Sequence, residues 1–368
     1  MQRNILITGG AGFIGRRLIN ELSKAEPESR IWVLDNLHPQ VHGENAKAPE
    51  FPDSVIFVKA DVADKSAVRS IVAQSQPELV YHLAAETGTG QSYDEISRYC
   101  DVNVMGTTNL VESIRQQAGN ITERIVLAAS RAVYGEGAYR DSTGRVYAGL
   151  PRQANSMSSG DFDVPMPAEA KLPVLAHPSN AELPPAPASI YASTKLMQEY
   201  IFKQAGEGAP WQATILRFQN VYGPGQSLRN PYTGVLSIFA RQLLEGKSLA
   251  IYEDGLIARD FVYVDDVANA LFRAGQYHLP HGTTLDIGFG SAATILDIAQ
   301  LLIKNLGCAE NNYAITGQFR VGDIRHACAD ISAAQALLDW RPQVSVETGL
   351  SLLADWARTE FELHQKLM

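Results

Sequence analysis

The chain has 368 residues, 45% of them hydrophobic and 19% charged, and its 31 Lys and Arg against 40 Asp and Glu give a net charge of −9. This composition provides enough apolar surface for a core and excludes a disordered or fibrous chain. Nucleic-acid-binding surfaces depend on clustered Lys and Arg, so the acidic balance without a basic run excludes nucleic acid as a partner.

The three cysteines, Cys100, Cys308 and Cys328, form no C-x-x-C pair and have no His at ligand spacing. This pattern excludes a disulfide framework, and we expect no metal site. No stretch reaches the roughly 18 uninterrupted apolar residues of a membrane helix. The apolar run near the N-terminus is too short for a signal-peptide core. We therefore expect a cytoplasmic protein without a membrane partner.

Short apolar runs alternate with longer amphipathic stretches through the first 220 residues. The runs predicted to be strands are Ile5–Thr8, Ile31–Leu34, Val55–Val58, Leu79–Leu83, Ile125–Ala128 and Ala213–Leu216. The stretches predicted to be helices are residues 13–24, 65–74, 94–118 and 190–205. Continuous apolar strands that alternate with helices are typical of a parallel sheet covered on both faces. The sequence therefore predicts a doubly wound α/β fold.

Residues 140–188 interrupt this pattern, because they contain eight of the 18 prolines and show no periodicity. We predict a long loop there, either a mobile flap beside a site or a surface insert. After residue 222 the pattern becomes mixed, with short helices predicted at 234–245, 265–275, 294–306, 332–338 and 346–358. We assign residues 1–222, with about 262–290, to the first domain, which carries the Pro-rich insert. Residues 223–261 and 291–368 form a smaller mixed α/β domain.

A glycine-rich loop joins the first predicted strand to the first helix, with the sequence Gly9-Gly10-Ala11-Gly12-Phe13-Ile14-Gly15. In a Rossmann-type fold such glycines allow the turn, the approach of a pyrophosphate and close helix packing, and the helix N-terminus attracts the anion. Asp35 ends the second strand, where a carboxylate accepts both ribose hydroxyls and repels a 2′-phosphate. This arrangement favours NAD over NADP. The alternative is an ordinary strand-to-helix turn with a capping Asp.

Tyr191 and Lys195 are four residues apart, so they share one face of the predicted helix at 190–205. Ser130 ends the strand that precedes the Pro-rich segment. A nearby ammonium and an oxidised nicotinamide both favour phenolate, and a downward pKa shift of about three units corresponds to roughly 4 kcal/mol. A phenolate can remove a hydroxyl proton while hydride leaves to the nicotinamide, with Ser130 bonded to the same oxygen. The alternative is a core tyrosine and a strand-end serine.

Further motifs accompany these residues along nearly the whole chain. They are His82-Leu83-Ala84-Ala85, Asn103 within residues 101–107, Val133-Tyr134-Gly135, residues 216–224, residues 259–267 and Arg320-Val321-Gly322-Asp323. Together with the glycine loop and the Ser130, Tyr191 and Lys195 set, they resemble the extended short-chain dehydrogenase/reductase family. More narrowly, they resemble its NAD-dependent nucleotide-sugar epimerase/dehydratase branch.

This resemblance implies an enzyme with NAD as cofactor and a nucleotide sugar as substrate, bound by the first and the smaller domain respectively. The implied catalytic residues are Ser130, Tyr191 and Lys195. The implied cofactor-binding residues are Gly9, Gly12, Phe13, Ile14, Gly15, Asp35, Asn36, Asp61, Val62, Leu83, Ala84, Ala85, Thr87, Asn103, Tyr191 and Lys195. The implied substrate-binding residues are Ser130, Asn220, Arg259 and Arg320, the last three for the diphosphate; the alternative for the arginines is a solvated surface position. The resemblance also implies a homodimer formed through helices 94–118 and 190–205.

The residues that follow Ser130 distinguish between reactions of this branch. Its 4,6-dehydratases typically carry an Asp and a Glu there, whereas this chain has Arg131 and Ala132. Without these proton-transfer groups, elimination of water is disfavoured. The remaining simple outcome is 4-epimerisation through a 4-keto sugar, with NAD regenerated.

Three stretches, residues 35–43, 85–92 and 130–137, resemble the dTDP-L-rhamnose 4-epimerases, which form dTDP-6-deoxy-L-talose. Within the enzyme class the alternatives are a UDP-hexose or UDP-uronate 4-epimerase and a 4-keto-sugar reductase that consumes NAD(P)H. Outside that class the alternative is a non-catalytic NAD-binding scaffold.

Overall fold

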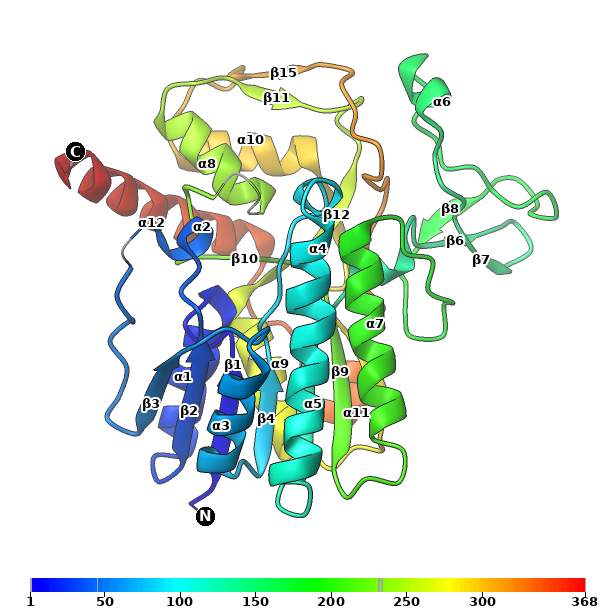
Figure 1. Cartoon of the computed structure of the whole chain (residues 1–368). Helices are drawn as coiled ribbons and strands as arrows, with labels where there is room; N and C mark the ends of the chain where they lie inside the picture. The colour runs from blue at the N-terminus through cyan, green and yellow to red at the C-terminus, as the bar shows by residue number, and fades with distance from the viewer. Residues whose placement is uncertain (1, 45, 231, 233, 368) are drawn as a thin grey trace.

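Seven parallel strands form the centre of the protein (Figure 1). The computed structural model describes residues 2–44, 46–230, 232 and 234–367. The strands follow the order β13-β9-β5-β4-β1-β2-β3. Their bounds are β1 Asn4–Thr8, β2 Arg30–Asp35, β3 Val55–Lys59, β4 Leu79–His82, β5 Arg124–Ser130, β9 Gln212–Phe218 and β13 Thr283–Ile287. Each of the six predicted runs coincides with one of these strands, so the predicted doubly wound α/β fold is confirmed.

The edge strand β13 is the one strand of this sheet that sequence periodicity does not predict. Its polar residues, among them Asp286, interrupt the apolar pattern. The Asp286 side chain is nevertheless buried and accepts a hydrogen bond from the Tyr134 hydroxyl at 2.8 Å. Burial raises the pKa of Asp286 to about 7. A long-range partner therefore allows a carboxylate at this buried strand position.

Helices cover both faces of the sheet, as doubly wound topology requires. On one face lie α1 Phe13–Ala25, α9 Val264–Gln276 and α11 Ser332–Leu338. On the other lie α3 Lys65–Ser75, α5 Gly106–Gln117 and α7 Ile190–Ala205. Strand order reverses between β1 and β4, and such a reversal opens a crevice at the carboxyl ends of the strands. Within the part of the chain described, no helix is long and apolar enough to cross a membrane.

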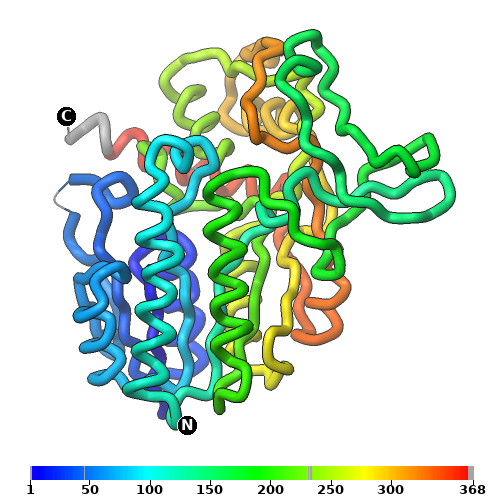
Figure 2. The backbone as a smooth tube through the Cα atoms, turned by 45° about the vertical axis from the view of Figure 1, so that its right-hand side comes forward, coloured from blue at the N-terminus to red at the C-terminus, as the bar shows by residue number. Residues whose placement is uncertain are grey.

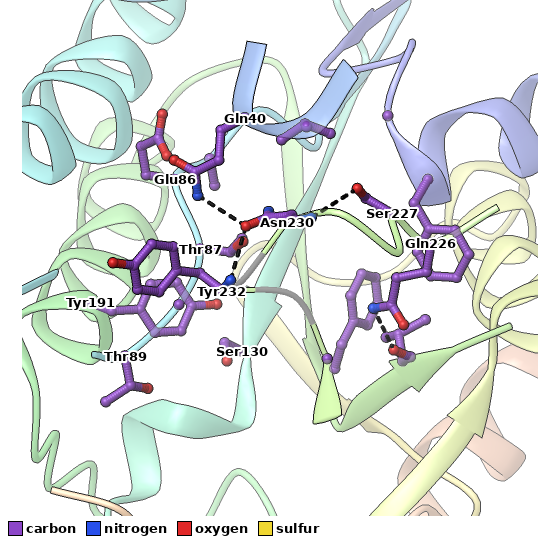
Figure 3. Close-up of a pocket in the computed structure, with 18 of the residues that line it drawn as sticks. Gln40, Glu86, Thr87, Thr89, Ser130, Tyr191, Gln226, Ser227, Asn230 and Tyr232 are labelled. Carbon is purple, nitrogen blue, oxygen red and sulfur yellow. Dashed lines mark hydrogen bonds between the residues drawn. The ribbon is translucent and has the colours of Figure 1, made fainter. Parts of the chain in front are cut away.

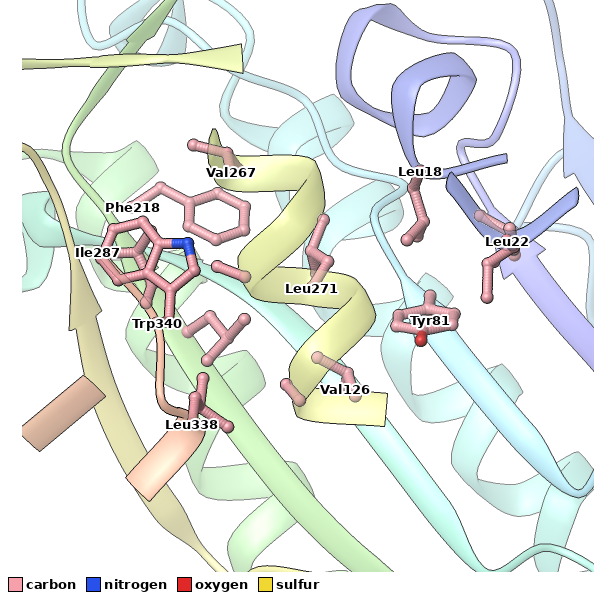
Figure 4. Close-up of a cluster of buried hydrophobic side chains, with 14 of the residues drawn as sticks. Leu18, Leu22, Tyr81, Val126, Phe218, Val267, Leu271, Ile287, Leu338 and Trp340 are labelled. Atoms are coloured by element: carbon pink, nitrogen blue, oxygen red, sulfur yellow. The ribbon is translucent and has the colours of Figure 1, made fainter. Parts of the chain in front are cut away.

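Apolar side chains from both helical layers pack against the sheet. Figure 4 shows the cluster under α1 and α9, where Leu18 and Leu271 are fully buried. Trp340 closes one end of this cluster, and its indole N–H donates to Asp266 O at 3.0 Å. A second cluster lies under α3, α5 and α7. The sheet is therefore buried on both faces, which explains its continuous apolar runs.

A second lobe lies above the carboxyl ends of the strands in Figure 1. It contains a sheet of β10 Asn220–Tyr222, β12 Ala258–Tyr263 and β14 Ala292–Thr294, and a parallel pair of β11 Leu249–Ile251 and β15 Tyr313–Ile315. Its helices are α8 Val235–Leu244, α10 Ile295–Asn305 and α12 Val346–Leu367. These elements share their own apolar cluster. The second lobe, which has its own core, thus covers the crevice of the first lobe.

The helix predicted over residues 94–118 is divided into three parts. After a short turn at Gln91–Tyr93, α4 (Ile96–Tyr99) leads into a π-helical segment, Cys100–Met105, and then α5. Within that segment the Asn103 side chain bonds to groups outside the helix. Its Oδ1 accepts from Glu86 N at 2.7 Å, and its Nδ2 donates to Thr194 Oγ1 at 2.9 Å. Single π-turns of this kind are frequent at functional sites.

Most of the Pro-rich segment is irregular, as the prediction of a loop over 140–188 states, but the segment also contains short regular elements that were not predicted. Together with β6 Ala138–Arg140, the strands β7 Val146–Ala148 and β8 Leu175–His177 form an antiparallel sheet, and α6 spans Ala154–Ser158. The segment projects from the side of the molecule (Figure 2). The side chain of Arg152 is buried and fixes the base of this segment through ion pairs with Glu136 at 3.1 Å and Glu253 at 2.9 Å. A strand of three residues is too short to show the alternation of apolar and polar residues by which strands are recognised in a sequence.

A buried ion pair fixes α7 to the sheet. Arg217, on β9, donates through Nε and Nη2 to the two carboxylate oxygens of Glu199, on α7, at 2.9 and 2.7 Å. Both side chains are almost inaccessible, at 3% and 1% exposed. Removing one partner of such a pair leaves an uncompensated buried charge.

We expect the substitution Arg217→Met to lower the free energy of unfolding by about 3–5 kcal/mol, because Glu199 then remains buried without its cation. Denaturant unfolding measures this loss. The double variant R217M/E199L should recover most of it, since no charge is left to bury. The matched control is R140Q, at the exposed contact of Arg140 with His177, with an expected change within about 0.5 kcal/mol. An R217M variant as stable as the parent would contradict the assignment.

Candidate active site

One cavity of about 1180 Å³ opens at the carboxyl ends of the central strands, between the two lobes. Of the site residues predicted from the sequence, all except Asn103 line it. They are Gly9, Gly12, Phe13, Ile14, Gly15, Asp35, Asn36, Asp61, Val62, Leu83, Ala84, Ala85, Thr87, Ser130, Tyr191, Lys195, Asn220, Arg259 and Arg320. Asn103 is fully buried and holds the backbone of Glu86, a lining residue.

Figure 3 shows the cavity between Tyr191 and Ser130 on the sheet side and residues of the second lobe. Where the lobes meet, the Gln40 amide donates to Asn230 Oδ1 at 3.1 Å. The same amide of Gln40 donates to Gln91 Oε1 at 2.9 Å. The bond between Gln40 and Asn230 joins α2 (Pro39–His42), the helix that follows β2, to the loop that precedes α8.

Glycines shape the part of the cavity next to β1. Gly9 has a φ of +71°, and a Cβ added there would lie 2.7 Å from Ala84 N. A Cβ added to Gly15 would lie 2.6 Å from Gly10 Cα. Gly12 immediately precedes α1 and brings no side chain to cap it. The uncapped N–H groups of a helix start, in a loop without side chains, suit the pyrophosphate of a dinucleotide.

Acidic side chains form the next part of the wall. The Asp35 carboxylate accepts from Ala11 N at 3.0 Å and Leu37 N at 2.9 Å, which fixes its orientation at the end of β2. Asn36 Nδ2 donates to Asp61 Oδ2 at 2.9 Å. Each Asp35 oxygen keeps a second lone pair for a ribose hydroxyl. The glycine loop and these carboxylates therefore fit NAD.

Ser130 and Tyr191 meet because β5 ends where α7 begins. Ser189 caps α7 by accepting from Ala192 N at 3.1 Å, which places Tyr191 in the first turn. Burial raises the pKa of Tyr191, and a hydrogen bond with Ser130 and the charge of Arg131 act against this rise. In the protein alone the pKa of Tyr191 is thus raised. The sequence-based expectation was a lowered pKa, and it included the positive charge of an oxidised nicotinamide.

Lys195 lies one turn beyond Tyr191 on the same helix face. It is 4% exposed, and its ammonium donates to Ala128 O, on β5, at 2.7 Å. Burial lowers the pKa of Lys195 to about 7. The site therefore holds a half-buried phenol and a buried ammonium on one helix, with a serine hydroxyl beside the phenol. This set can exchange a proton with a substrate hydroxyl.

Arg131 is a lining residue whose importance sequence reasoning missed, because it served there only as evidence that a carboxylate is absent. Among the residues described, its guanidinium has no hydrogen-bond or ion-pair partner. Burial and the nearby Arg259 lower its pKa to about 9. The usable signal was an arginine directly after Ser130, the serine predicted to be catalytic, in an acidic chain. A cation without a partner beside Tyr191 favours phenolate.

The two arginines predicted to bind diphosphate lie on the second lobe. Arg259, on β12, is 6% exposed and donates to Asp323 Oδ1 at 2.6 Å. The Arg320 guanidinium lies over the Tyr252 ring, 5.0 Å from its centroid. Asn220 begins β10 on the same side. Because all three line the same cavity as the glycine loop, that cavity allows a second anionic ligand.

The described residues contain no cluster of three or more His, Cys, Asp and Glu side chains that could hold a metal ion. Cys100, Cys308 and Cys328 are free thiols.

Comparison with known proteins gives a consistent result. The model of the NAD dependent epimerase/dehydratase family matches residues 5–152 and 167–288. A dTDP-L-rhamnose 4-epimerase of Burkholderia thailandensis is 42% identical over 361 residues, which cover 98% of this chain and 96% of that protein. The crystal structure of a Thermotoga maritima UDP-glucose 4-epimerase with UDP-glucose is similar, with a TM-score of 0.77, 27% identity and coverage of 97% and 99%. A Thermus thermophilus UDP-glucose 4-epimerase complex with NAD has a TM-score of 0.76, 28% identity and coverage of 96% and 98%.

We expect Arg131→Gln to raise the pKa of Tyr191, because the variant loses the cation that favours phenolate. Ultraviolet difference absorbance against the same variant with Tyr191→Phe isolates the titration of this one phenol. The variant R131K keeps the charge and should titrate nearer to the parent protein. Equal titration of Tyr191 in R131Q and the parent would show that Arg131 has no electrostatic role there.

Proposed function

The chain belongs to the NAD dependent epimerase/dehydratase family, and we propose that it is a nucleotide-sugar 4-epimerase that converts dTDP-L-rhamnose to dTDP-6-deoxy-L-talose. One observation carries the reaction class. Ser130, Tyr191 and Lys195 line one cavity, whereas Arg131 and Ala132 supply no carboxylic acid for elimination of water. The 42% identity to a dTDP-L-rhamnose 4-epimerase over almost the whole chain supports the substrate.

In the proposed reaction Tyr191 takes the proton of the sugar C4 hydroxyl, and Ser130 hydrogen-bonds the same oxygen. NAD, which the glycine loop and Asp35 would hold, would supply the acceptor for the C4 hydride and then its donor. Lys195 and Arg131 place positive charge near Tyr191, which favours the phenolate that this step needs. The hydride returns to the opposite face of the 4-keto sugar, and Tyr191 gives the proton back to the oxygen. No net oxidation results, so NAD is regenerated in each turnover.

Epimerisation also requires that the sugar turns while its diphosphate stays bound. Arg259 is held by Asp323 and by two backbone carbonyls, so its position is fixed before substrate binds. Arg320 has a ring contact with Tyr252 and retains its N–H donors for a ligand. With Asn220, these residues anchor the diphosphate on the second lobe in this proposal.

We also propose a homodimer formed through the outer faces of α4, α5 and α7. Met197 and Tyr200 are 46% and 43% exposed on α7, and Met105 is 49% exposed at the end of the π-helical segment, directly before α5. Phe202, in contrast, is fully buried in the protein's own core. Exposed large apolar side chains on neighbouring helices are typical of a subunit interface. A monomer in sedimentation would contradict this assembly.

The deciding experiment is incubation with dTDP-L-rhamnose, UDP-glucose and UDP-glucuronate in separate reactions, with products identified by chromatography and NMR. Conversion of dTDP-L-rhamnose to its C4 epimer, with unchanged bound NAD, supports the proposal. Conversion of a UDP-sugar alone would replace the substrate. Stoichiometric consumption of NADH would identify a reductase, and loss of one water a dehydratase.

We expect Tyr191→Phe to reduce turnover by a factor of roughly 10²–10⁴, since the variant lacks the proton acceptor. The glycine loop and the Asp35 region are untouched, so bound NAD should be retained. Turnover and the NAD content of the purified protein measure the two effects. Full activity in this variant would refute the assignment of Tyr191.

We expect Arg320→Ala to raise KM for the nucleotide sugar by roughly 10- to 100-fold, the effect of losing a charged hydrogen bond of about 1.5–3 kcal/mol. The matched control is Lys171→Ala, which removes an exposed cation on the insert and should leave KM unchanged. Steady-state kinetics of both variants make the comparison. An equal effect of the two substitutions would contradict a specific diphosphate contact.

A further inference from the structure

Behind the cavity wall lies a buried polar network that ends at Lys195. Thr8, His82, Thr107 and Gln198 are each at most 1% exposed. Gln198 lies on α7, one turn after Lys195, and its Oε1 accepts from the Lys195 ammonium at 2.5 Å. Its Nε2 donates to Thr107 Oγ1, on α5, at 2.7 Å. The other residues continue this chain to the ends of β4 and β1.

The hydrogen bonds of the network determine which way the Gln198 amide points. The Thr107 hydroxyl donates to Asn103 O at 2.6 Å, so its oxygen can only accept from other side chains. It accepts from Gln198 Nε2 and, at 2.9 Å, from His82 Nε2. His82 Nδ1 is then left to accept from the Thr8 hydroxyl at 2.7 Å. Gln198 must therefore present its carbonyl oxygen, not its NH₂ group, to Lys195.

His82 is kept neutral, as this pattern requires. Burial, with the nearby charge of Lys195, lowers the pKa of His82 to about 3. The Thr8 oxygen is itself bonded to Ala84 N at 3.3 Å, so Thr8 accepts from the backbone and donates to the ring. This assignment gives each hydrogen bond of the chain from Thr8 to Lys195 one donor and one acceptor. The remaining contact, between Gln198 Nε2 and His82 Nε2 at 3.3 Å, then brings two donors together and is not a hydrogen bond.

The consequence for Lys195 follows from a count of its donors. An ammonium has three N–H groups, and here one donates to Ala128 O at 2.7 Å and one to Gln198 Oε1. Lys195 lines the cavity, so the third N–H is left for the ligand side. Glu199 contributes an attractive charge, but its carboxylate is bonded to Arg217. Gln198 is therefore the side chain that both directs the ammonium and solvates its charge.

We propose that Gln198 is a positioning residue for Lys195: its amide oxygen, oriented by Thr107 and His82, keeps the ammonium charged and directed into the cavity. The role of this ammonium in turnover rests on the proposed function, whereas its titration does not. A neutral Lys195 would no longer favour the Tyr191 phenolate, so activity on the alkaline side depends on the Lys195 proton.

Opposite substitutions at Gln198 test the proposal. Gln198→Leu removes the acceptor, which lowers the pKa of Lys195, so the alkaline fall of kcat should begin at lower pH. Gln198→Glu adds a charged acceptor and should move that fall to higher pH. At neutral pH we expect kcat of Q198L to fall roughly 10-fold, the effect of one charged hydrogen bond, with little change in KM for dTDP-L-rhamnose. A purely structural role would move both variants in the same direction.

Direct titration of Lys195 separates this proposal from the proposed function. The NMR signal of ¹³Cε-labelled lysine, assigned by its loss in Lys195→Met, reports the protonation of Lys195 without any substrate. Movement of this titration to lower pH in Q198L and to higher pH in Q198E supports the proposal even if no nucleotide sugar is converted. The same titration pH in both variants and the parent would overturn it, whatever the activity.

A matched pair of threonines provides a second route if the Gln198 variants fold poorly. Thr107 and Thr108 are neighbours on α5, and each hydroxyl donates to the carbonyl four residues earlier. Only Thr107 also accepts from Gln198, so Thr107→Val should release the amide and lower the pH of Lys195 titration. Thr108→Val should leave the titration unchanged. An equal result for the two variants would also contradict the proposal.

Discussion

The structure depends on two buried charges carried by one helix. Lys195 and Glu199 lie four residues apart on the face of α7 that packs against the sheet, and each is at most 4% exposed. An unpaired charge in such a place costs several kcal/mol, so each needs a defined partner. Glu199 has Arg217 on β9, and Lys195 has Ala128 O on β5. These contacts fix α7 against two strands, and Tyr191 reaches Ser130 as a consequence.

The same rule explains how an acidic protein presents cations to an anionic substrate. Arg152, Arg259 and Arg325 each pair with carboxylates of the second lobe or the insert. Over the described part of the chain, Arg131 and Arg320 line the cavity without an ion-pair partner. Net charge acts over the whole surface, whereas ligand binding depends on the few charges that lack a local partner. A net charge of −9 is therefore compatible with a site for phosphates.

The framework of the fold can be predicted from the sequence, whereas the polar residues at buried positions are predicted poorly. Buried strands and glycine turns follow from local pattern, which is why six central strands and the position of the glycine loop could be predicted. The exceptions depend on partners distant in sequence: Asp286 on β13 needs Tyr134, and Asn103 in the π-helical segment needs Glu86 and Thr194. Gln198 belongs to this group, since Thr107 lies 91 positions away. No local period reveals such pairs.

The division of the cavity between the lobes suits the proposed reaction. The groups proposed to exchange the proton lie on β5 and α7 of the first lobe. Buried contacts fix α7 against the sheet, so these groups cannot follow a moving ligand. The arginines proposed to hold the diphosphate lie on the second lobe, across the cavity. A nucleotide sugar anchored there reaches the catalytic groups only through its hexose, which is joined to the diphosphate by rotatable bonds. Rigid catalytic groups with a separate anchor therefore permit either face of C4 to be presented to the same tyrosine.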